Sequence, residues 1–325
     1  MTVFEHAEAA IAAPTTRTIT THTAKRPRRV QPAKERGVIS VGDRKRRTVR
    51  VWLWIIQALT LVGLVFAGLG PLAWSAKAAI SDSYAIITDP MGIWFTPNEW
   101  GNLIAAWNAG QIGPALGNTV ALAVGSTVVT LFVCTTGAYL LSALRPRWGK
   151  VLSAAILATL FLPGVISLVP LYLTILNLPV LNVSLINTYW AVWLPAGASA
   201  FNVLILKQFF DSIPRELVEA ARIDGAGPVR VFATIILPLS RPILGVVALL
   251  TIVASWKDFL WPMLVLPDSA LQPVSVALPH LAKGSTPFAV QMAAVFLSII
   301  IPIVLFLVFQ KQFLRGVGTA GGVKG

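Results

Sequence analysis

Six long apolar stretches constrain this chain more than any other feature of its sequence. A helix needs about 20 predominantly apolar residues to cross the roughly 30 Å hydrocarbon core of a membrane, and each stretch is close to that length. Only 12% of the residues are charged, whereas soluble globular domains carry roughly 25%. The sequence therefore predicts an all-α integral membrane protein with six transmembrane helices. We place these helices at residues 51–74, 116–140, 151–175, 188–206, 243–263 and 288–309.

The basic residues predict the orientation of these helices, because Lys and Arg accumulate in cytoplasmic loops. With the amino terminus inside, 23 of the 26 Lys and Arg fall in cytoplasmic segments, so both termini are predicted to be cytoplasmic. Twelve of them lie in residues 1–50, a Thr-, Ala- and Pro-rich tail without an apolar period that is predicted to be disordered. Two interpretations of its basic clusters at 25–29 and 44–47 stay open. Attraction to anionic lipid is the one we favour, and binding of nucleic acid or a partner is the other.

The same pattern divides the chain into four parts. Residues 1–50 form the tail, 51–115 the first transmembrane helix with an outer loop, 116–311 the transmembrane core, and 312–325 a cytoplasmic tail. Pro163, Gly164 and Pro170 predict a kinked or broken third helix, which membrane proteins tolerate where neighbouring helices resatisfy the backbone.

A polar segment at residues 211–242 separates the fourth and fifth predicted helices. Asp211 or Ser212 offers a capping oxygen and Pro214 suits a first helical turn, so a short helix is predicted from there to Gly225. A second short helix is predicted from Pro228 to Pro238. The segment is therefore expected to be a helix-turn-helix beneath the membrane, although a generic loop of this length is more often an ordinary amphipathic connector.

The residues of this segment resemble the cytoplasmic coupling motif of binding-protein-dependent ABC importers. The residues that carry the resemblance are Glu219, Ala220, Ala221, Asp224, Gly225, Ala226, Phe232, Ile235, Leu237, Pro238 and Pro242. The resemblance implies a type I ABC importer permease in a bacterial cell membrane, whose segment inserts into a cleft on an ATPase subunit. It also implies that Ala220 and Ala221 allow a close approach, that Glu219 offers a carboxylate to a partner Arg, and that Gly225 permits the sharp turn.

Three further runs resemble the carbohydrate branch of that family, specifically the second permease of maltose-type importers. These runs are Ala138-Tyr139-Leu140 through Arg145, Pro163 with Pro170-Leu171-Tyr172, and Ser255-Trp256-Lys257-Asp258-Phe259-Leu260-Trp261-Pro262. The chain departs from the pattern at Lys257, where Asn is usual, and at Asp258, where Glu is usual. The resemblance implies a second permease, two ATPase subunits, an extracytoplasmic binding protein and a sugar substrate. It also implies a carboxyl-terminal tail that reaches the ATPases, with Gln312, Gly316, Gly322 and Lys324.

Five residues are candidates for the translocation path: Asn118, Tyr172, Asn202, Trp256 and Asp258. Charges at membrane depth are functional candidates, but Lys257 and Asp258 can also snorkel to the membrane surface if they lie near the helix end. Aromatic residues suit sugar stacking and equally suit an ordinary interfacial belt. Both alternatives stay open from the sequence.

No catalytic residue, cofactor site or metal site is predicted on this chain. It lacks a GxxxxGK[ST] phosphate loop, so ATP with Mg²⁺ is expected on the partner ATPase. The three His follow no spacing of a metal site or of a nucleophile with its base. Two rival functions remain: a permease of the same family for amino acids or peptides, and a secondary transporter or membrane enzyme, which the few intramembrane charges disfavour.

Overall fold

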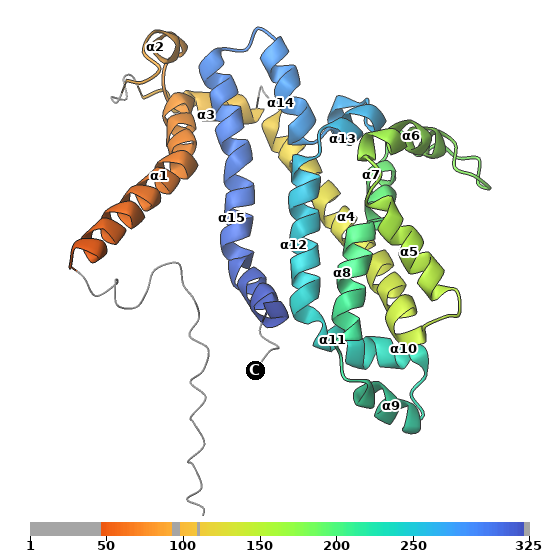
Figure 1. Cartoon of the computed structure of the whole chain (residues 1–325). Coiled ribbons are helices and arrows are strands. Elements are labelled where there is room, and N and C mark those ends of the chain that lie inside the picture. Colours follow the sequence, from red (N-terminus) through yellow and green to blue (C-terminus); the bar gives the residue numbers. More distant parts are fainter. Residues whose placement is uncertain (1–46, 93–97, 109–110, 322–325) are drawn as a thin grey trace, which may run out of the picture. The chain divides into compact units, whose positions relative to one another are not determined.

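The computed structural model describes residues 47–92, 98–108 and 111–321, and these residues form helices and no strand. The chain divides into two compact units, residues 1–63 and 64–325, with the boundary inside the first helix. The helices, labelled as in Figure 1, are α1 (Arg47–Ala79), α2 (Ser83–Thr88), α3 (Gly101–Asn108), α4 (Ile112–Tyr139), η2 (Leu140–Leu144), α5 (Gly149–Thr159), η3 (Gly164–Ser167), α6 (Leu168–Leu176), α7 (Trp190–Gly197), α8 (Ala200–Asp211), α9 (Arg215–Ile223), α10 (Pro228–Val231), η4 (Phe232–Ile236), α11 (Leu237–Leu239), α12 (Arg241–Lys257), α13 (Leu260–Val265), η5 (Ser269–Leu271), α14 (Val274–Lys283) and α15 (Phe288–Gly321).

Two of the described helices are long and apolar enough to cross a membrane without interruption: Arg47–Ala79 and Ile112–Leu144. Three bent helix pairs pass the same test of length and composition together, which gives up to five spans, and Phe288–Val304 is a shorter apolar helix. The predicted break in the third helix is confirmed, since α5 meets the η3–α6 helix at 105°. The fourth predicted helix is also broken, with 44° between α7 and α8, which the sequence analysis did not predict.

The predicted boundaries differ from the structure at both ends of the chain. Helix α1 begins at Arg47, so the last four residues of the tail predicted to be disordered are helical, and residues 1–46 lie outside the described part. Helix α15 continues to Gly321, so the predicted boundary at residue 312 is not a helix end. In each case the helix extends past the apolar stretch that defined it, because the backbone hydrogen bonds of a helix do not require apolar side chains.

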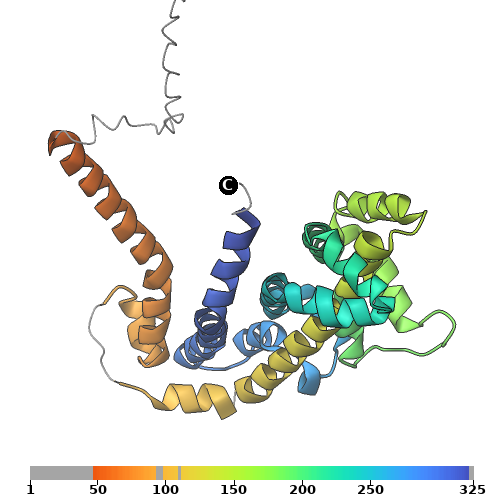
Figure 2. The ribbon, with the colours of Figure 1, turned by 90° about the horizontal axis from the view of Figure 1, so that it is seen from below.

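Helix α4 is the central element of the second unit and packs against α7, α8 and α12 (Figures 1 and 2). Two of its buried threonines donate to the backbone of α4 itself: Thr119 Oγ1 to Ala115 O at 2.7 Å and Thr127 Oγ1 to Ala123 O at 2.7 Å. Such bonds satisfy a polar side chain without a partner helix. The helix can therefore carry polar residues and still be packed on several sides.

The break between α7 and α8 is compensated by side chains of α4. Pro195 lies inside α7 and has no N–H to continue the helical ladder. Carbonyl oxygens near the break accept from α4 instead: Thr130 Oγ1 donates to Ala196 O at 3.0 Å and Cys134 Sγ to Gly197 O at 3.4 Å. On the other side of the break Ser199 caps α8 by accepting from Asn202 N at 3.4 Å. Cys134 thus serves as a hydrogen-bond donor at the break.

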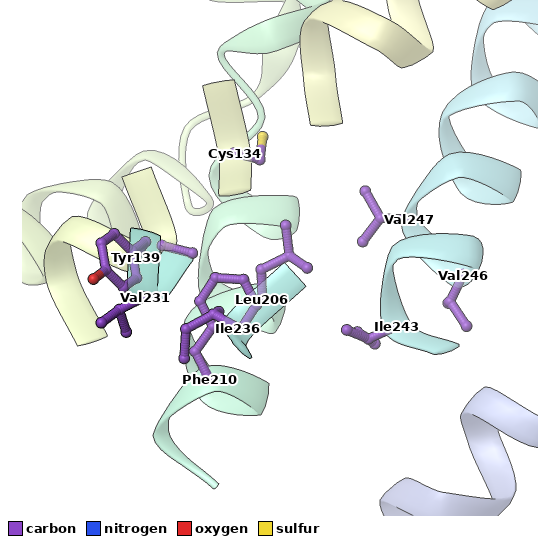
Figure 3. Close-up of a cluster of buried hydrophobic side chains, with 10 residues drawn as sticks. Cys134, Tyr139, Leu206, Phe210, Val231, Ile236, Ile243, Val246 and Val247 are labelled. Atoms are coloured by element: carbon purple, nitrogen blue, oxygen red, sulfur yellow. The ribbon is translucent and has the colours of Figure 1, made fainter. Parts of the chain in front are cut away.

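A buried cluster joins the 211–242 segment to the long helices. It contains Cys134, Ala138, Tyr139, Leu206, Phe210, Val231, Ile236, Ile243, Val246 and Val247. Figure 3 shows that these side chains come from α4, α8, α12 and the α10–η4 helix. The second half of the segment is therefore part of the core of this unit and not a mobile connector.

Candidate coupling segment and membrane cavity

The 211–242 segment folds as a helix, a turn and a second helix, at the ends of α8 and α12 (Figure 1). Helix α9 ends at Ile223, and Gly225 follows with φ = 81°, a left-handed conformation that glycine adopts without the cost that a Cβ adds. The second helix begins with Pro228 at its first position and runs to Leu239, one residue beyond the predicted end at Pro238.

The predicted cap of the first helix is wrong. Pro214 stands at the cap position of α9 and no side chain bonds to the helix start. Asp211 is instead the last residue of α8, where its carboxylate meets Lys207 Nζ at 2.7 Å and Arg145 Nη2 at 3.5 Å. With two cations beside it, the carboxylate has opposite charges close enough to stabilise its ionised form without capping α9.

The two helices of the segment differ in burial. Helix α9 has no buried residue; Val218 and Ala221 are half-buried against the core cluster. Its other face is open, and Ile223 is 87% exposed. Of the predicted coupling residues, the exposed ones are Glu219, Ala220, Asp224, Gly225 and Pro238, and the half-buried ones are Ala221, Ala226, Phe232 and Leu237.

Gly225→Ala is expected to strain the turn between α9 and α10, because a left-handed backbone costs a residue with a Cβ about 1–2 kcal/mol. We expect the apparent melting temperature of the purified protein to fall by a few degrees, or α9 to become more accessible to limited proteolysis. Gly227→Ala is the matched control, since Gly227 has φ = −69° and open space where a Cβ would lie. Equal behaviour of the two variants would contradict the role given to the turn.

A cavity of about 660 Å³ lies among α4, α6, α7, α8, α12 and α13. Its polar lining consists of Ser126, Ser199, Asn202, Thr251, Ser255, Lys257 and Asp258, and its apolar lining includes Phe201 and Trp261. Ser126 is 2% exposed and its hydroxyl has no hydrogen-bond partner in the described structure. A buried polar atom without a partner is costly, so this hydroxyl is available to a hydroxylated ligand.

The cavity brings together two of the five predicted path residues, Asn202 and Asp258. Ser126, Ser199 and Thr251 also line the cavity but were not among the predicted path residues; they come from three different helices or helix ends. Hydroxyl residues are frequent in membrane helices and most bond their own backbone, as Thr251 Oγ1 does to Val247 O at 2.9 Å. No sequence signal separates the few that line a cavity.

The other three predicted path residues lie elsewhere. Asn118 joins the far end of α4 to its neighbours: its Oδ1 accepts from Tyr189 at 2.7 Å, and its Nδ2 donates to Ala270 O at 2.8 Å. Tyr172 packs half-buried against a separate apolar cluster. Trp256 lines a second, apolar cavity of about 480 Å³ between α12, α14 and α15.

Lys257 and Asp258 lie where α12 ends. The backbone oxygen of Asp258 accepts from Ser275 Oγ at 2.6 Å, and its Oδ1 accepts from Trp261 N at 3.4 Å. The half-buried carboxylate thus keeps acceptor capacity toward the cavity. The exposed Lys257 lines both cavities.

The remaining predicted residues lie at the carboxyl terminus. Gln312 and Gly316 belong to α15, while Gly322 and Lys324 lie outside the described residues. His280 stands in the last turn of α14. In the described ranges, no group of three or more His, Cys, Asp and Glu side chains is placed to hold a metal ion.

Comparisons with known proteins agree with this architecture. Residues 134–318 match the family model described as "Binding-protein-dependent transport system inner membrane component". The chain is 32% identical over 295 residues to the probable ABC transporter permease protein YurM of Bacillus subtilis (strain 168), covering 88% of this chain and 94% of that protein. It is 31% identical over 280 residues to the sn-glycerol-3-phosphate transport system permease protein UgpE of Yersinia pestis bv. Antiqua (strain Antiqua), covering 83% and 96%.

A solved structure is also similar. It is a chain of a bacterial ABC transporter involved in the import of the acidic polysaccharide alginate, with a TM-score of 0.71, 25% identity, and coverage of 82% of this chain and 98% of that one. The family match, the relatives and the shared fold all concern the same membrane component. The chain therefore belongs to the family of binding-protein-dependent transport system inner membrane components, as a permease subunit of an ABC importer and not an enzyme.

Proposed function

We propose that this permease moves a carbohydrate across a bacterial inner membrane by alternating access, driven by partner ATPase subunits. The observation that supports this cargo class is the 660 Å³ cavity, which is lined by hydroxyl, amide and carboxylate groups and by Trp261. Such groups suit a ligand with many hydroxyls. The relatives support this class, because one is named for sn-glycerol-3-phosphate and another imports the polysaccharide alginate.

The proposed topology has six spans and cytoplasmic termini. In it, residues 1–50 and 312–325 are cytoplasmic tails, 51–115 hold the first helix and an outer loop, and 116–311 form the permease core. The distribution of Lys and Arg supports this orientation. It places α9 on the cytoplasmic side, within reach of an ATPase.

The α9 helix is proposed as the coupling helix that docks into a cleft of the ATPase. Its exposed face carries Glu219, Ala220 and Ile223, which combine a charge, a close-approach site and an apolar anchor. Amphipathic helices bind grooves with this combination. Closure of the ATPase pair would pull on α9 and, through α8 and α12, open the cavity to the outside.

The complete importer is proposed to contain a second permease, two ATPase subunits and an extracytoplasmic binding protein. The family description itself names dependence on a binding protein. The carboxyl-terminal residues Gln312, Gly316, Gly322 and Lys324 are proposed to contact the ATPases.

The cargo class is tested by uptake in the source bacterium with and without the gene. Radiolabelled probes would be maltose, sn-glycerol-3-phosphate, alginate oligosaccharides, glutamate and a tripeptide. Loss of uptake for one of the first three, restored by the gene on a plasmid, is the expected result. Loss confined to glutamate or the tripeptide would overturn the carbohydrate assignment in favour of an amino-acid or peptide permease.

Ser126→Ala tests the cavity as the binding region. Because the hydroxyl has no hydrogen-bond partner among the described residues, its removal is expected to leave the melting temperature unchanged or higher. The same change should raise the KM of uptake about 2–10-fold, the effect of one neutral hydrogen bond. Ser298→Ala is the control, since Ser298 lies on α15 in the second cavity and donates to Ala294 O at 2.6 Å. An unchanged KM for Ser126→Ala would remove Ser126 from the path.

A further inference from the structure

The run from Ala138 to Arg145 has no role in the function proposed above, yet it forms the end of α4 that touches the coupling segment. Here α4 passes into a π-helix, Leu140–Leu144, and the segment contains another, Phe232–Ile236. Inside α-helices, π-helical turns are rare and are frequently found at functional sites. Tyr139, the last residue of α4 before the first π-helix, packs on Phe232, the first residue of the second, with 4.9 Å between the ring centroids.

Tyr139 links the end of α4 to the residues that directly follow α9 in the sequence. Its hydroxyl donates to Pro228 O at 2.9 Å, and its ring is buried in the core cluster with Val231 and Ile236. Because Pro228 is the first residue of α10, this bond holds the exit of the turn that follows α9. The link joins residues 89 positions apart in the sequence.

A second link joins η2, the π-helical continuation of α4, to the end of α8 just before α9. Ser142, itself 4% exposed, donates from Oγ to Asp211 Oδ1 at 2.8 Å. Arg145 contacts both residues of this link: its Nε donates to Ser142 O at 2.6 Å, and its Nη2 lies 3.5 Å from Asp211 Oδ1. Lys207 neutralises the other carboxylate oxygen at 2.7 Å. Hydrogen bonds to an ionised carboxylate are strong and have a defined geometry, so Asp211 holds the end of α8 firmly against Ser142 and Arg145.

These two links bracket α9, although α4 is not adjacent to it in the chain. From Tyr139 the helix runs back to Ser126 in the cavity wall, a rise of about 20 Å at 1.5 Å per residue. A displacement of α9 would therefore reach the cavity by a third route, besides the continuous chain through α8 and α12.

We propose that Tyr139 and Ser142 are positioning residues that transmit the movement of the coupling helix to α4. The proposal rests on the coupling role of α9. Without these two hydroxyls, ATP-driven movement would still reach α12 through the backbone, but α4 would follow it less, so the Ser126 side of the cavity would fail to open.

The test uses the complete importer, with both permeases, the ATPases and the binding protein, in proteoliposomes. Cys134→Ala gives a background without native thiol in this chain, and a reporter cysteine is placed either at Ser126 on α4 or at Ala254 on α12. A cationic methanethiosulfonate reagent outside the vesicles probes each reporter, with and without ATP and vanadate. Phosphate release measures ATP hydrolysis in parallel.

In the parent, ATP and vanadate are expected to raise labelling of both reporters. The double variant Tyr139→Phe, Ser142→Ala should lower the ATP-dependent labelling at position 126 about fivefold or more, as expected when two partly buried hydrogen bonds are lost. Labelling at position 254 and ATP hydrolysis should change less than twofold. Tyr189→Phe is the matched control, because it removes another tyrosine hydroxyl bonded to α4, at Asn118 Oδ1 and away from the segment.

Three outcomes would overturn the inference. Normal labelling at position 126 in the double variant would show that α4 needs neither hydroxyl. Equal losses at positions 126 and 254, or an equal loss in Tyr189→Phe, would show a general effect on stability and not a route through α4. A parent in which neither reporter responds to ATP would refute the proposed coupling itself, and the inference with it.

Discussion

Replacing Glu219 with Lys is expected to lower uptake roughly 100-fold while the protein still inserts into the membrane at normal amounts. Loss of one partner from a desolvated charge pair at an interface costs about 2–5 kcal/mol, much of it the penalty on the group left behind. Glu219 is exposed on α9, and no ion pair joins it to another described side chain in this chain. Its carboxylate is thus free for an Arg of the ATPase. Uptake, immunoblots of membranes and ATPase activity of the purified importer would measure the effect.

Two control variants distinguish loss of the ATPase contact from a general effect of the charge reversal on the protein. Glu219→Gln removes the charge without adding a cation between Arg215 and Arg222, and it should retain an intermediate activity. Glu99→Lys makes the same charge reversal at an exposed glutamate that precedes α3, and it should transport normally. Normal uptake by Glu219→Lys would remove Glu219 from the coupling role.

Gly125→Ala is expected to destabilise the membrane core by about 1–3 kcal/mol, the usual cost of overpacking. A Cβ at this position would overlap the indole ring of Trp193. The ring has little room to move, because Trp190 and Tyr189 lie 5.1 and 5.6 Å from it between ring centroids. A lower apparent melting temperature of the permease in detergent, with reduced uptake, is the expected measurement.

Gly117→Ala provides the comparison on the same helix. A Cβ at Gly117 meets nothing within 4 Å, so this change should be neutral or should stabilise α4 by up to about 1 kcal/mol through helix propensity. If both variants melt alike, the close contact between α4 and α7 does not limit stability.

The long apolar helices and the helix-turn-helix were predictable from sequence because their causes are local. About 20 apolar residues in a row define a membrane span, and Gly225 and Pro228 mark a turn and a helix start by their own backbone chemistry. The break at Ser199 was missed although Pro195 is a local signal for it, because the break also depends on Thr130 and Cys134 of another helix, which donate hydrogen bonds to the freed carbonyls.

Asp211 shows the same limit within the candidate site. Its position suggested a local cap, but its partners Ser142 and Arg145 stand 69 and 66 positions away. Polar residues in membrane helices were equally ambiguous: Asn118 bonds its neighbours, whereas Asn202 lines the cavity. Residue type and spacing do not show whether an Asn bonds neighbouring helices or lines a cavity, because this depends on which helix packs opposite it.

Helix α9 has no buried residue, although the helix that follows it is part of the core. Most of its side chains can therefore be exchanged without repacking the membrane helices. Under the proposed role, a permease of this design can acquire a different ATPase by substitutions along the exposed face of one nine-residue helix. The surface that determines the partner and the packing that determines the fold can then evolve almost independently.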